Sequence, residues 1–315
     1  MNILVTGVGG DIGQSVVRCL REAVPSARLI GCDIDPYAPG SVLVDRFELV
    51  PRAVDANRYL QRIAEIVKMH KVSYVFPITD GEIDVFDQHR KRLQNTIVLI
   101  INPFALSVFS DKYKTVLHLE RHGLHCPRSF RIEDFTNQLD YPFLIKARRG
   151  WGGRGLIKIQ TAEEFAFHRD RVSNAIVQEI VGTTDEEYTV GVFSDGVNTH
   201  SINFRRYLGY GNLSKFVELV HDEELDRIAR VAADSCDLRG PLNVQLRKTG
   251  EGYMPFEVNA RISSTVYFRH CFGFQDVKWW LNLLEGEPIE YKPRYQKGIG
   301  VRVISEAFFD LEEVV

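Results

Sequence analysis

One predicted strand places three polar side chains of different chemistry on the same face. Glu257, Asn259 and Arg261 occupy alternate positions, between the apolar residues Phe256, Val258 and Ala260. Strand side chains repeat every second residue, so the polar set shares one face and the apolar set shares the other. The turn at 249–252 predicts a hairpin that sets Gln245 opposite Glu257. Oxygen atoms of this kind are the ligands that Mg²⁺ prefers, so the pattern is compatible with a metal site and equally with a solvated sheet face.

A glycine-rich segment follows another predicted strand, at residues 141–146, whose apolar run ends in Lys146. Closely spaced glycines allow backbone N–H groups to turn toward phosphate oxygens. A strand at 156–159 follows, where a P-loop would have a helix. The segment therefore predicts a phosphate-binding flap between two strands, with a flexible hairpin as the alternative. The residues concerned are Gly150, Gly152, Gly153 and Gly155, together with Arg148, Arg149 and Arg154.

A second lysine, Lys112, lies in the first turn of a helix predicted from residue 110 to residue 123. A cation near a helix N-terminus opposes the helix dipole. That small local cost suggests that Lys112 has a ligand to bind. A surface lysine without a ligand is the alternative interpretation.

The N-terminal segment has the order of a nucleotide-binding α/β unit. A strand at 2–6 is followed by the glycine loop Gly7–Gly13, a helix from Gln14, and a strand that ends in Asp33. The same pattern resembles the start of NAD(P)-dependent dehydrogenases and sugar epimerases. Those enzymes need a Tyr-x-x-x-Lys pair for proton transfer, and the chain contains none. We therefore favour a structural role for these glycines, in which they let a helix pack closely on a sheet.

The composition excludes several classes of protein. The chain has 315 residues, a hydrophobic content of 44% and a net charge of −3, so no global basic field favours nucleic acid. Its five cysteines form no CxxC pair, which argues against a disulfide framework and a zinc site. No apolar run has the length of a membrane span, and the first residues lack the features of a secretory leader. We therefore expect a cytoplasmic protein with reduced thiols.

Six segments, taken in order, resemble the ATP-grasp superfamily, in particular the ligase modules of carbamoyl phosphate synthetase. The resemblance implies an α/β chain whose C-terminal part is α+β. It begins with a Rossmann-like pre-ATP-grasp domain at 1–108, followed by an ATP-grasp small lobe with the flap at 109–190 and a large lobe with the metal site at 191–315. The matching segments are Asp111–Lys112, Pro142–Lys146, Gln178–Val181, Glu187–Val190, Asn243–Gln245 and Phe256–Arg261.

The resemblance also implies roles for individual residues. Lys112 and Lys146 correspond to the lysines that contact ATP phosphates, the glycine flap closes over them, and Arg261 joins Lys146 as a catalytic residue on the phosphate side. Glu187 corresponds to the acceptor for the ribose hydroxyls. The adenine hinge comprises Gln178, Glu179, Ile180 and Val181, and the ligands of Mg²⁺, or of Mn²⁺ in its place, are Gln245, Glu257 and Asn259. Many relatives have an acidic residue where this chain has Gln245.

The implied activity is that of a carboxylate–amine or carboxylate–thiol ligase. ATP phosphorylates a carboxylate, and the resulting acylphosphate reacts with a nucleophile. Arg205, Arg206, Ser263 and Ser264 are candidates for binding the acceptor, although structural roles are equally compatible with the sequence. The expected partners are small-molecule carboxylates and amines, which are the substrates. The sequence is also compatible with a homodimer or with binding to a partner subunit. Two alternatives stay open: an NAD(P)-binding oxidoreductase or epimerase, and a non-catalytic nucleotide-binding subunit.

Overall fold

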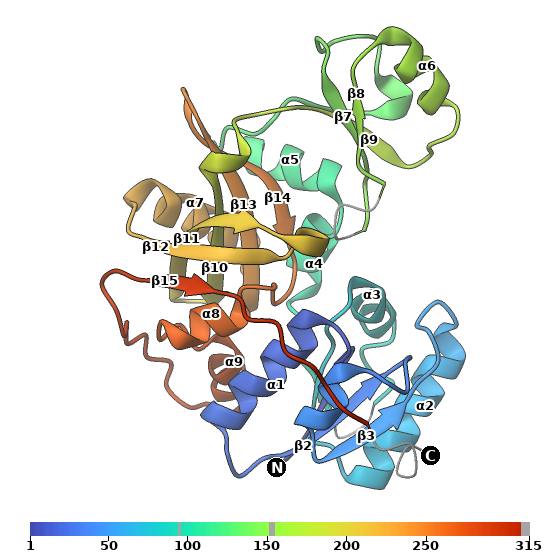
Figure 1. Ribbon diagram of the computed structural model, residues 1–315, viewed down its shortest axis with the longest axis vertical. Helices are drawn as coiled ribbons and strands as arrows, with labels where there is room; N and C mark the ends of the chain where they lie inside the picture. Colours follow the sequence, from blue (N-terminus) through green and yellow to red (C-terminus); the bar gives the residue numbers. More distant parts are fainter. Residues whose placement is uncertain (94–95, 151–154, 310–315) are drawn as a thin grey trace. The chain divides into compact units, whose positions relative to one another are not determined.

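The computed structural model describes residues 1–93, 96–150 and 155–309 (Figure 1). By its internal contacts the chain forms two compact units. The first unit comprises residues 1–101, 261–295 and 302–315, and the second comprises residues 102–260 and 296–301. The division into domains at residues 108 and 190 stays a prediction.

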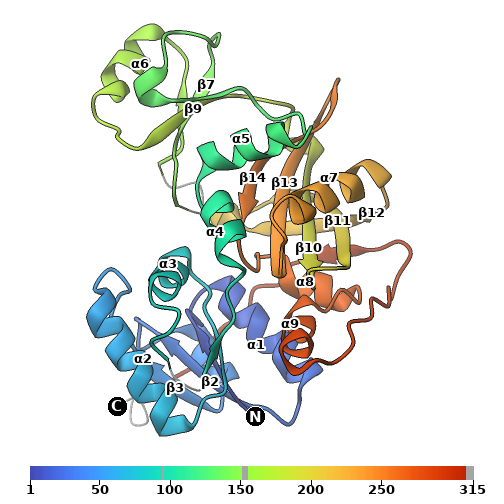
Figure 2. The ribbon, with the colours of Figure 1, turned by 180° about the vertical axis from the view of Figure 1, so that it is seen from behind.

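The first unit is built on a parallel sheet with the strand order β3-β2-β1-β4-β5. Helix α1 (Asp11–Ala23) covers one face, and α2 (Ala56–His70) and α3 (Asp80–Gln88) cover the other (Figures 1 and 2). Central strands covered on both faces are buried throughout, which explains their continuous apolar runs. The strands are β1 (Asn2–Thr6), β2 (Arg28–Asp33), β3 (Arg46–Leu49), β4 (Tyr74–Phe76) and β5 (Ile97–Val98).

The glycine loop of this unit serves close packing. A Cβ atom on Gly13 would lie 2.3 Å from the carbonyl oxygen of Gly7, so only glycine lets α1 begin this close to the loop. The backbone N–H of Gly9 donates to Oδ2 of Asp33 at 2.7 Å. The loop and the acidic strand end thus bind each other, as the packing interpretation requires.

Two further helices of the first unit come from the C-terminal part of the chain. They are α8 (Val266–Cys271) and α9 (Asp276–Glu285), and both contact α1. Trp279 and Trp280 of α9 are buried. Glu82 and Thr79 form a reciprocal capping box at the start of α3.

The second unit contains two antiparallel sheets. The smaller sheet has the order β6-β9-β7-β8 and buries Phe135, Phe143 and Val177 against helix α6 (Ala162–Arg169). The larger sheet has the order β14-β13-β10-β11-β12-β15. Helix α7 (Glu223–Asp234) packs on β10 and β11 through an apolar face that includes Leu225 and Ile228. The larger sheet carries the polar hairpin, which consists of β13 and β14.

The remaining bounds of the second unit follow. Strands of the smaller sheet are β6 (Ser129–Arg131), β7 (Phe143–Ala147), β8 (Ile157–Ile159) and β9 (Ala175–Glu179). Strands of the larger sheet are β10 (Glu187–Ser194), β11 (Thr199–Leu208), β12 (Ser214–Val220), β13 (Gly240–Thr249), β14 (Gly252–Asn259) and β15 (Ile299–Val301). Helices α4 (Pro103–Phe109) and α5 (Lys112–Arg121) precede the smaller sheet. Within the described residues, no helix is both long enough and apolar enough to cross a membrane.

Candidate nucleotide and metal site

The predicted hairpin forms with the predicted register. Gln245 on β13 lies opposite Glu257 on β14, and Asn243 lies opposite Asn259. Strand β10 pairs with the other edge of β13, which places Thr189 opposite Gln245 and Glu187 opposite Arg247. Directly opposed residues point to the same side of a sheet, so these polar side chains share one face of the larger sheet.

The position of Phe256 differs from the predicted alternation. The register shifts between Gln245 and Leu246, so Phe256 is the extra residue of a β-bulge. The side-chain nitrogen of Lys146 lies 5.4 Å from the centroid of the Phe256 ring, and the guanidinium carbon of Arg247 lies at 5.4 Å as well. The prediction that Phe256 faces the apolar side is therefore wrong. The ring instead supports two cations of the polar face.

The two predicted phosphate lysines lie near this face. Nζ of Lys112 donates to the carbonyl oxygen of Gly150 at 2.8 Å and lies 3.7 Å from Oε1 of Glu257. Nζ of Lys146 donates to Oε1 of Gln178 at 2.6 Å. Asp111 caps the helix that begins at Lys112 and also accepts hydrogen bonds from Arg148. Gly152 and Gly153 of the predicted flap lie outside the described residues.

Burial lowers the pKa of Lys146 from its ordinary value to about 8. The nearby cations Lys112 and Arg247 lower this pKa further, whereas Glu257 and Glu187 oppose the shift. Desolvation disfavours the charged form of a lysine, and positive neighbours do the same. A bound anion would offset both causes by stabilising the protonated lysine, so this environment favours a negatively charged ligand.

Glu187 is held between two arginines from neighbouring strands. Its Oε1 accepts from Nε and Nη2 of Arg206 at 3.0 and 2.8 Å, and its Oε2 accepts from Nε and Nη2 of Arg247 at 3.0 and 2.9 Å. Arg206 Nη2 also donates to Oε1 of Gln245 at 2.9 Å. An ionised carboxylate has about four acceptor positions, and all four are used here. In this arrangement Glu187 has none left for ribose hydroxyls, and its predicted ribose contact stays untested.

The predicted hinge begins with the last two residues of strand β9 and continues into the segment after it. Gln178 is 1% exposed, and its amide nitrogen donates to Oγ of Ser129 at 2.9 Å. Oε1 of Glu179 accepts the backbone N–H of Arg128 at 2.9 Å. These two side chains therefore fix the strand end, which leaves the backbone of Ile180 and Val181 as the candidate adenine contacts. The carbonyl oxygen of Val181 accepts from Nη1 of Arg247 at 3.3 Å.

The candidate acceptor residues all have partners within their own units. Arg205 donates to the carbonyl oxygen of Asp185 at 2.9 and 2.8 Å, whereas Arg206 belongs to the Glu187 network. In the first unit, Oγ of Ser263 accepts from Nη1 of Arg269 at 2.7 Å. The carbonyl oxygen of Ser264 accepts from Nη2 of Arg302 at 2.6 Å. Their role in acceptor binding stays a prediction.

Arg261 belongs to the first unit, although it follows Asn259 closely along the chain. Its Nη2 lies 3.1 Å from Oδ2 of Asp80, and its Nε lies 3.2 Å from both oxygens of that carboxylate. Nη1 donates to the carbonyl oxygen of Ile262 at 3.0 Å. The guanidinium is thus oriented within its unit, and its predicted catalytic role stays untested.

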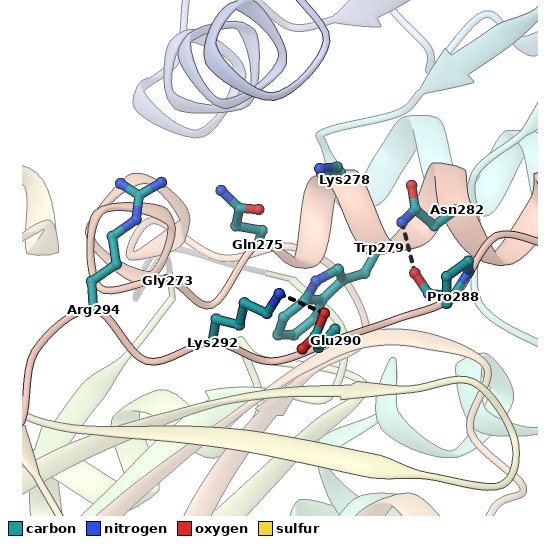
Figure 3. A pocket seen from close by; sticks show the side chains of 9 residues that line it. All are labelled: Gly273, Gln275, Lys278, Trp279, Asn282, Pro288, Glu290, Lys292 and Arg294. Carbon is teal, nitrogen blue, oxygen red and sulfur yellow. Dashed lines mark hydrogen bonds and ion pairs between the residues drawn. The ribbon is translucent and has the colours of Figure 1, made fainter.

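The first unit also contains a cavity of about 350 Å³ between α9 and the segment at 288–294 (Figure 3). Nζ of Lys292 lies 2.7 Å from Oε2 of Glu290, and the amide of Asn282 donates to the carbonyl oxygen of Pro288 at 3.0 Å. The buried ring of Trp279 forms one wall. None of the site residues predicted from the sequence lines this cavity.

The candidate metal ligands supply one carboxylate and two amide oxygens. Across the described ranges, no group of three His, Cys, Asp or Glu side chains could hold a metal ion. The oxygen atoms of Glu257, Asn259 and Gln245 fit the hard-ligand preference of Mg²⁺, which keeps several positions for water and phosphate. With a single carboxylate, this set is suited to a metal that arrives with phosphate oxygens.

Sequence reasoning missed Arg247 as a member of this face. The signal was available, because Arg247 occupies the alternate position after Gln245 on the same strand. Its significance depends on Glu187 and Val181, which lie about sixty residues away in the sequence. Only the pairing of β13 with β10 brings these residues together.

Two family models match the chain. The model for an ATP-grasp domain matches residues 109–265, and the model for a PylC-like N-terminal domain matches residues 3–101. Together they account for most of the sequence. Among proteins of curated function, no significant match was found.

Solved structures of several ligases and carboxylases are similar to this chain. The ADP complex of N5-carboxyaminoimidazole ribonucleotide synthetase has a TM-score of 0.74 and 17% identity, over 95% of this chain and 81% of that one. A second similar structure is the biotin carboxylase domain of 2-oxoglutarate carboxylase from Hydrogenobacter thermophilus, solved with MgADP and bicarbonate. Its TM-score is 0.73 and its identity 16%, and the match covers 93% of this chain and 71% of that one. L-amino acid ligase from Bacillus licheniformis has a TM-score of 0.70 and 16% identity, over 90% of this chain and 74% of that one. At these identities the likeness establishes a shared fold.

Proposed function

Because the chain belongs to the ATP-grasp superfamily, we propose that it is an ATP- and Mg²⁺-dependent ligase. It activates a carboxylate as an acylphosphate, which an amine or a similar nucleophile then attacks. Two of the similar structures contain ADP, in one case as its magnesium salt, and a third is an amino acid ligase, which supports the proposal.

The observation that supports this proposal best is the convergence of two lysines and the candidate metal ligands at one face of the second unit. Lys112 lies 3.7 Å from Glu257, and Lys146 lies over the ring of Phe256, the residue before Glu257. Glu257 in turn opposes Gln245. Cations beside a row of oxygen ligands are what a metal-bound polyphosphate requires.

The chemistry proceeds by two displacements at different centres. A carboxylate oxygen of the substrate attacks the γ-phosphorus of ATP, and the bond to the β-phosphate oxygen breaks to release ADP. The amine then attacks the acylphosphate carbon, and phosphate leaves with the electron pair while the amine loses a proton. Lys112 and Lys146 would stabilise the phosphate charge, and no protein nucleophile is required. When bound, Mg²⁺ would neutralise phosphate charge beside Glu257, Asn259 and Gln245.

Binding of Mg·ATP, measured by calorimetry, tests the nucleotide part of the proposal. Wild-type protein should bind, and Lys146→Met and Glu257→Gln should bind weakly. Lys158→Met and Glu251→Gln are matched controls, because Lys158 is an exposed lysine of the same small sheet and Glu251 lies at the exposed tip of the same hairpin. Both controls should bind like wild type. Wild-type protein that binds no Mg·ATP would refute the proposal.

A screen for ADP release tests the ligase part. Amino acids and other carboxylates are supplied in pairs with amines, and products are identified by mass spectrometry. Coupled release of ADP and an amide product is expected for at least one pair. Nucleotide binding without turnover across the whole panel would instead favour the non-catalytic subunit.

A further inference from the structure

We propose that Arg247 contacts the α-phosphate of the bound nucleotide and so takes part in nucleotide recognition. This inference rests on the proposed function, because it assumes that the polar face of the second unit binds ATP. It assigns a nucleotide contact to a residue outside the six segments that carry the family resemblance. Four features of the site support it: unused donors, exposure, position and charge.

The first feature is the number of unused donors on Arg247. A guanidinium carries five N–H donors in a planar fork. Arg247 uses two of them on Oε2 of Glu187 and a third on the carbonyl oxygen of Val181. One N–H on Nη1 and one on Nη2 are therefore available within the described hydrogen bonds. They belong to a side chain whose orientation is already fixed from two directions.

The second feature is the difference in exposure between the two arginines on Glu187. The side chain of Arg206 is 7% exposed, whereas that of Arg247 is 22% exposed. Arg206 bonds Glu187 and Gln245 inside the sheet face, so it holds the carboxylate in place. Arg247 thus keeps side-chain surface that a ligand can reach.

The third feature is the position of Arg247 between the two ends of the candidate nucleotide site. At one end it bonds the carbonyl oxygen of Val181, in the segment expected to contact adenine. At the other end it shares the ring of Phe256 with Lys146, the candidate phosphate lysine. A group between adenine and the terminal phosphates lies at the level of the ribose and the α-phosphate.

The fourth feature is charge, which selects the phosphate over the ribose. Glu187 is shared with Arg206, so its single negative charge does not offset both arginines. Lys112, Lys146 and Arg247 therefore leave an excess of positive charge around Glu257. A planar guanidinium with two free N–H donors is matched to phosphate oxygens, and such charge-assisted bonds are stronger than bonds to a neutral hydroxyl.

Competition binding with adenosine, AMP and ADP tests the assignment, with displacement of a fluorescent ADP analogue as the readout. In Arg247→Met, the affinities for AMP and ADP should fall by a similar factor, roughly 10- to 100-fold for a charged hydrogen bond. The affinity for adenosine should stay within about twofold of wild type, because adenosine has no phosphate. Arg247→Lys keeps the charge without the fork and should give an intermediate loss. Arg230→Met, an exposed arginine of α7, is the matched control.

The outcomes separate this inference from the proposed function. Equal losses of affinity for adenosine, AMP and ADP in Arg247→Met would show that Arg247 only shapes the hinge. Unchanged affinities would show that Arg247 makes no contact with the nucleotide. Either result would overturn the inference. Wild-type protein that binds no ADP would overturn the proposed function together with it. Thermal unfolding of each variant identifies a folding defect, and if Arg247→Met does not fold, the adenosine-to-ADP comparison in Arg247→Lys decides.

Discussion

Replacement of Glu187 by glutamine should destabilise the second unit strongly. The carboxylate is 3% exposed and accepts four N–H groups from two arginines. Glutamine keeps the shape but removes the charge, and its amide nitrogen points a donor at one of the guanidiniums. Removing one partner from a buried ion pair costs about 3–5 kcal/mol, because the remaining charge stays buried without compensation. Arg247 is partly exposed, so we expect the lower end, about 3 kcal/mol.

The assay is thermal and urea unfolding of Glu187→Gln beside a matched control. Glu186→Gln is the control, because Glu186 pairs with Arg205 at 3.2 Å while its side chain is 40% exposed. We expect a decrease in Tm of about 6–12 °C for Glu187→Gln and less than about 3 °C for Glu186→Gln. The double variant Glu187→Gln/Arg206→Gln should recover part of the loss, since it removes the uncompensated guanidinium. A loss below about 1 kcal/mol in Glu187→Gln would refute the account of this network.

Three further predictions concern the titration of Lys146 and the metal. The pKa of Lys146 in the folded protein is about 8, below its ordinary value, so the lysine is protonated below that pH and neutral above it. The affinity for ADP should therefore fall as pH rises through 8. Calorimetry in buffers of different ionisation enthalpy should show proton uptake on binding, and Lys146→Arg should abolish the pH dependence. A pH-independent affinity in wild type would contradict the reasoning. Because a lowered lysine pKa means that the unfolded chain binds the proton more tightly, this group also makes stability rise with pH between about 8 and the ordinary lysine value. Gln245→Glu adds a second carboxylate opposite Glu257. Half-maximal ADP formation should therefore need about tenfold less Mg²⁺. An unchanged Mg²⁺ requirement would argue against Gln245 as a ligand.

The polar hairpin could be predicted because its information is local. The turn at 249–252 and the alternation on β13 and β14 fix which residues oppose each other. The bulge at Phe256 was not predicted, although Pro255 indicates one. Proline cannot donate a ladder hydrogen bond and is found at bulges. A single extra residue then turned the aromatic ring toward the polar face.

The arginine network could not be predicted, because it depends on strand order. Arg206 and Arg247 reach Glu187 from sequence separations of 19 and 60 residues. Only the arrangement β13-β10-β11 makes them neighbours. Strand β3 is difficult to predict for a different reason: none of its four residues is fully buried, so it lacks a continuous apolar run.

The most direct test of the central claim is the binding of Mg·ATP to wild-type protein and to Glu257→Gln, measured by calorimetry at a pH below 8. The account predicts saturable, Mg²⁺-dependent binding by wild type, a loss of the Mg²⁺ dependence in Glu257→Gln, and wild-type behaviour in Glu251→Gln. Binding to wild type that is absent, or that is unchanged in Glu257→Gln, would contradict the assignment of this face as the nucleotide and metal site.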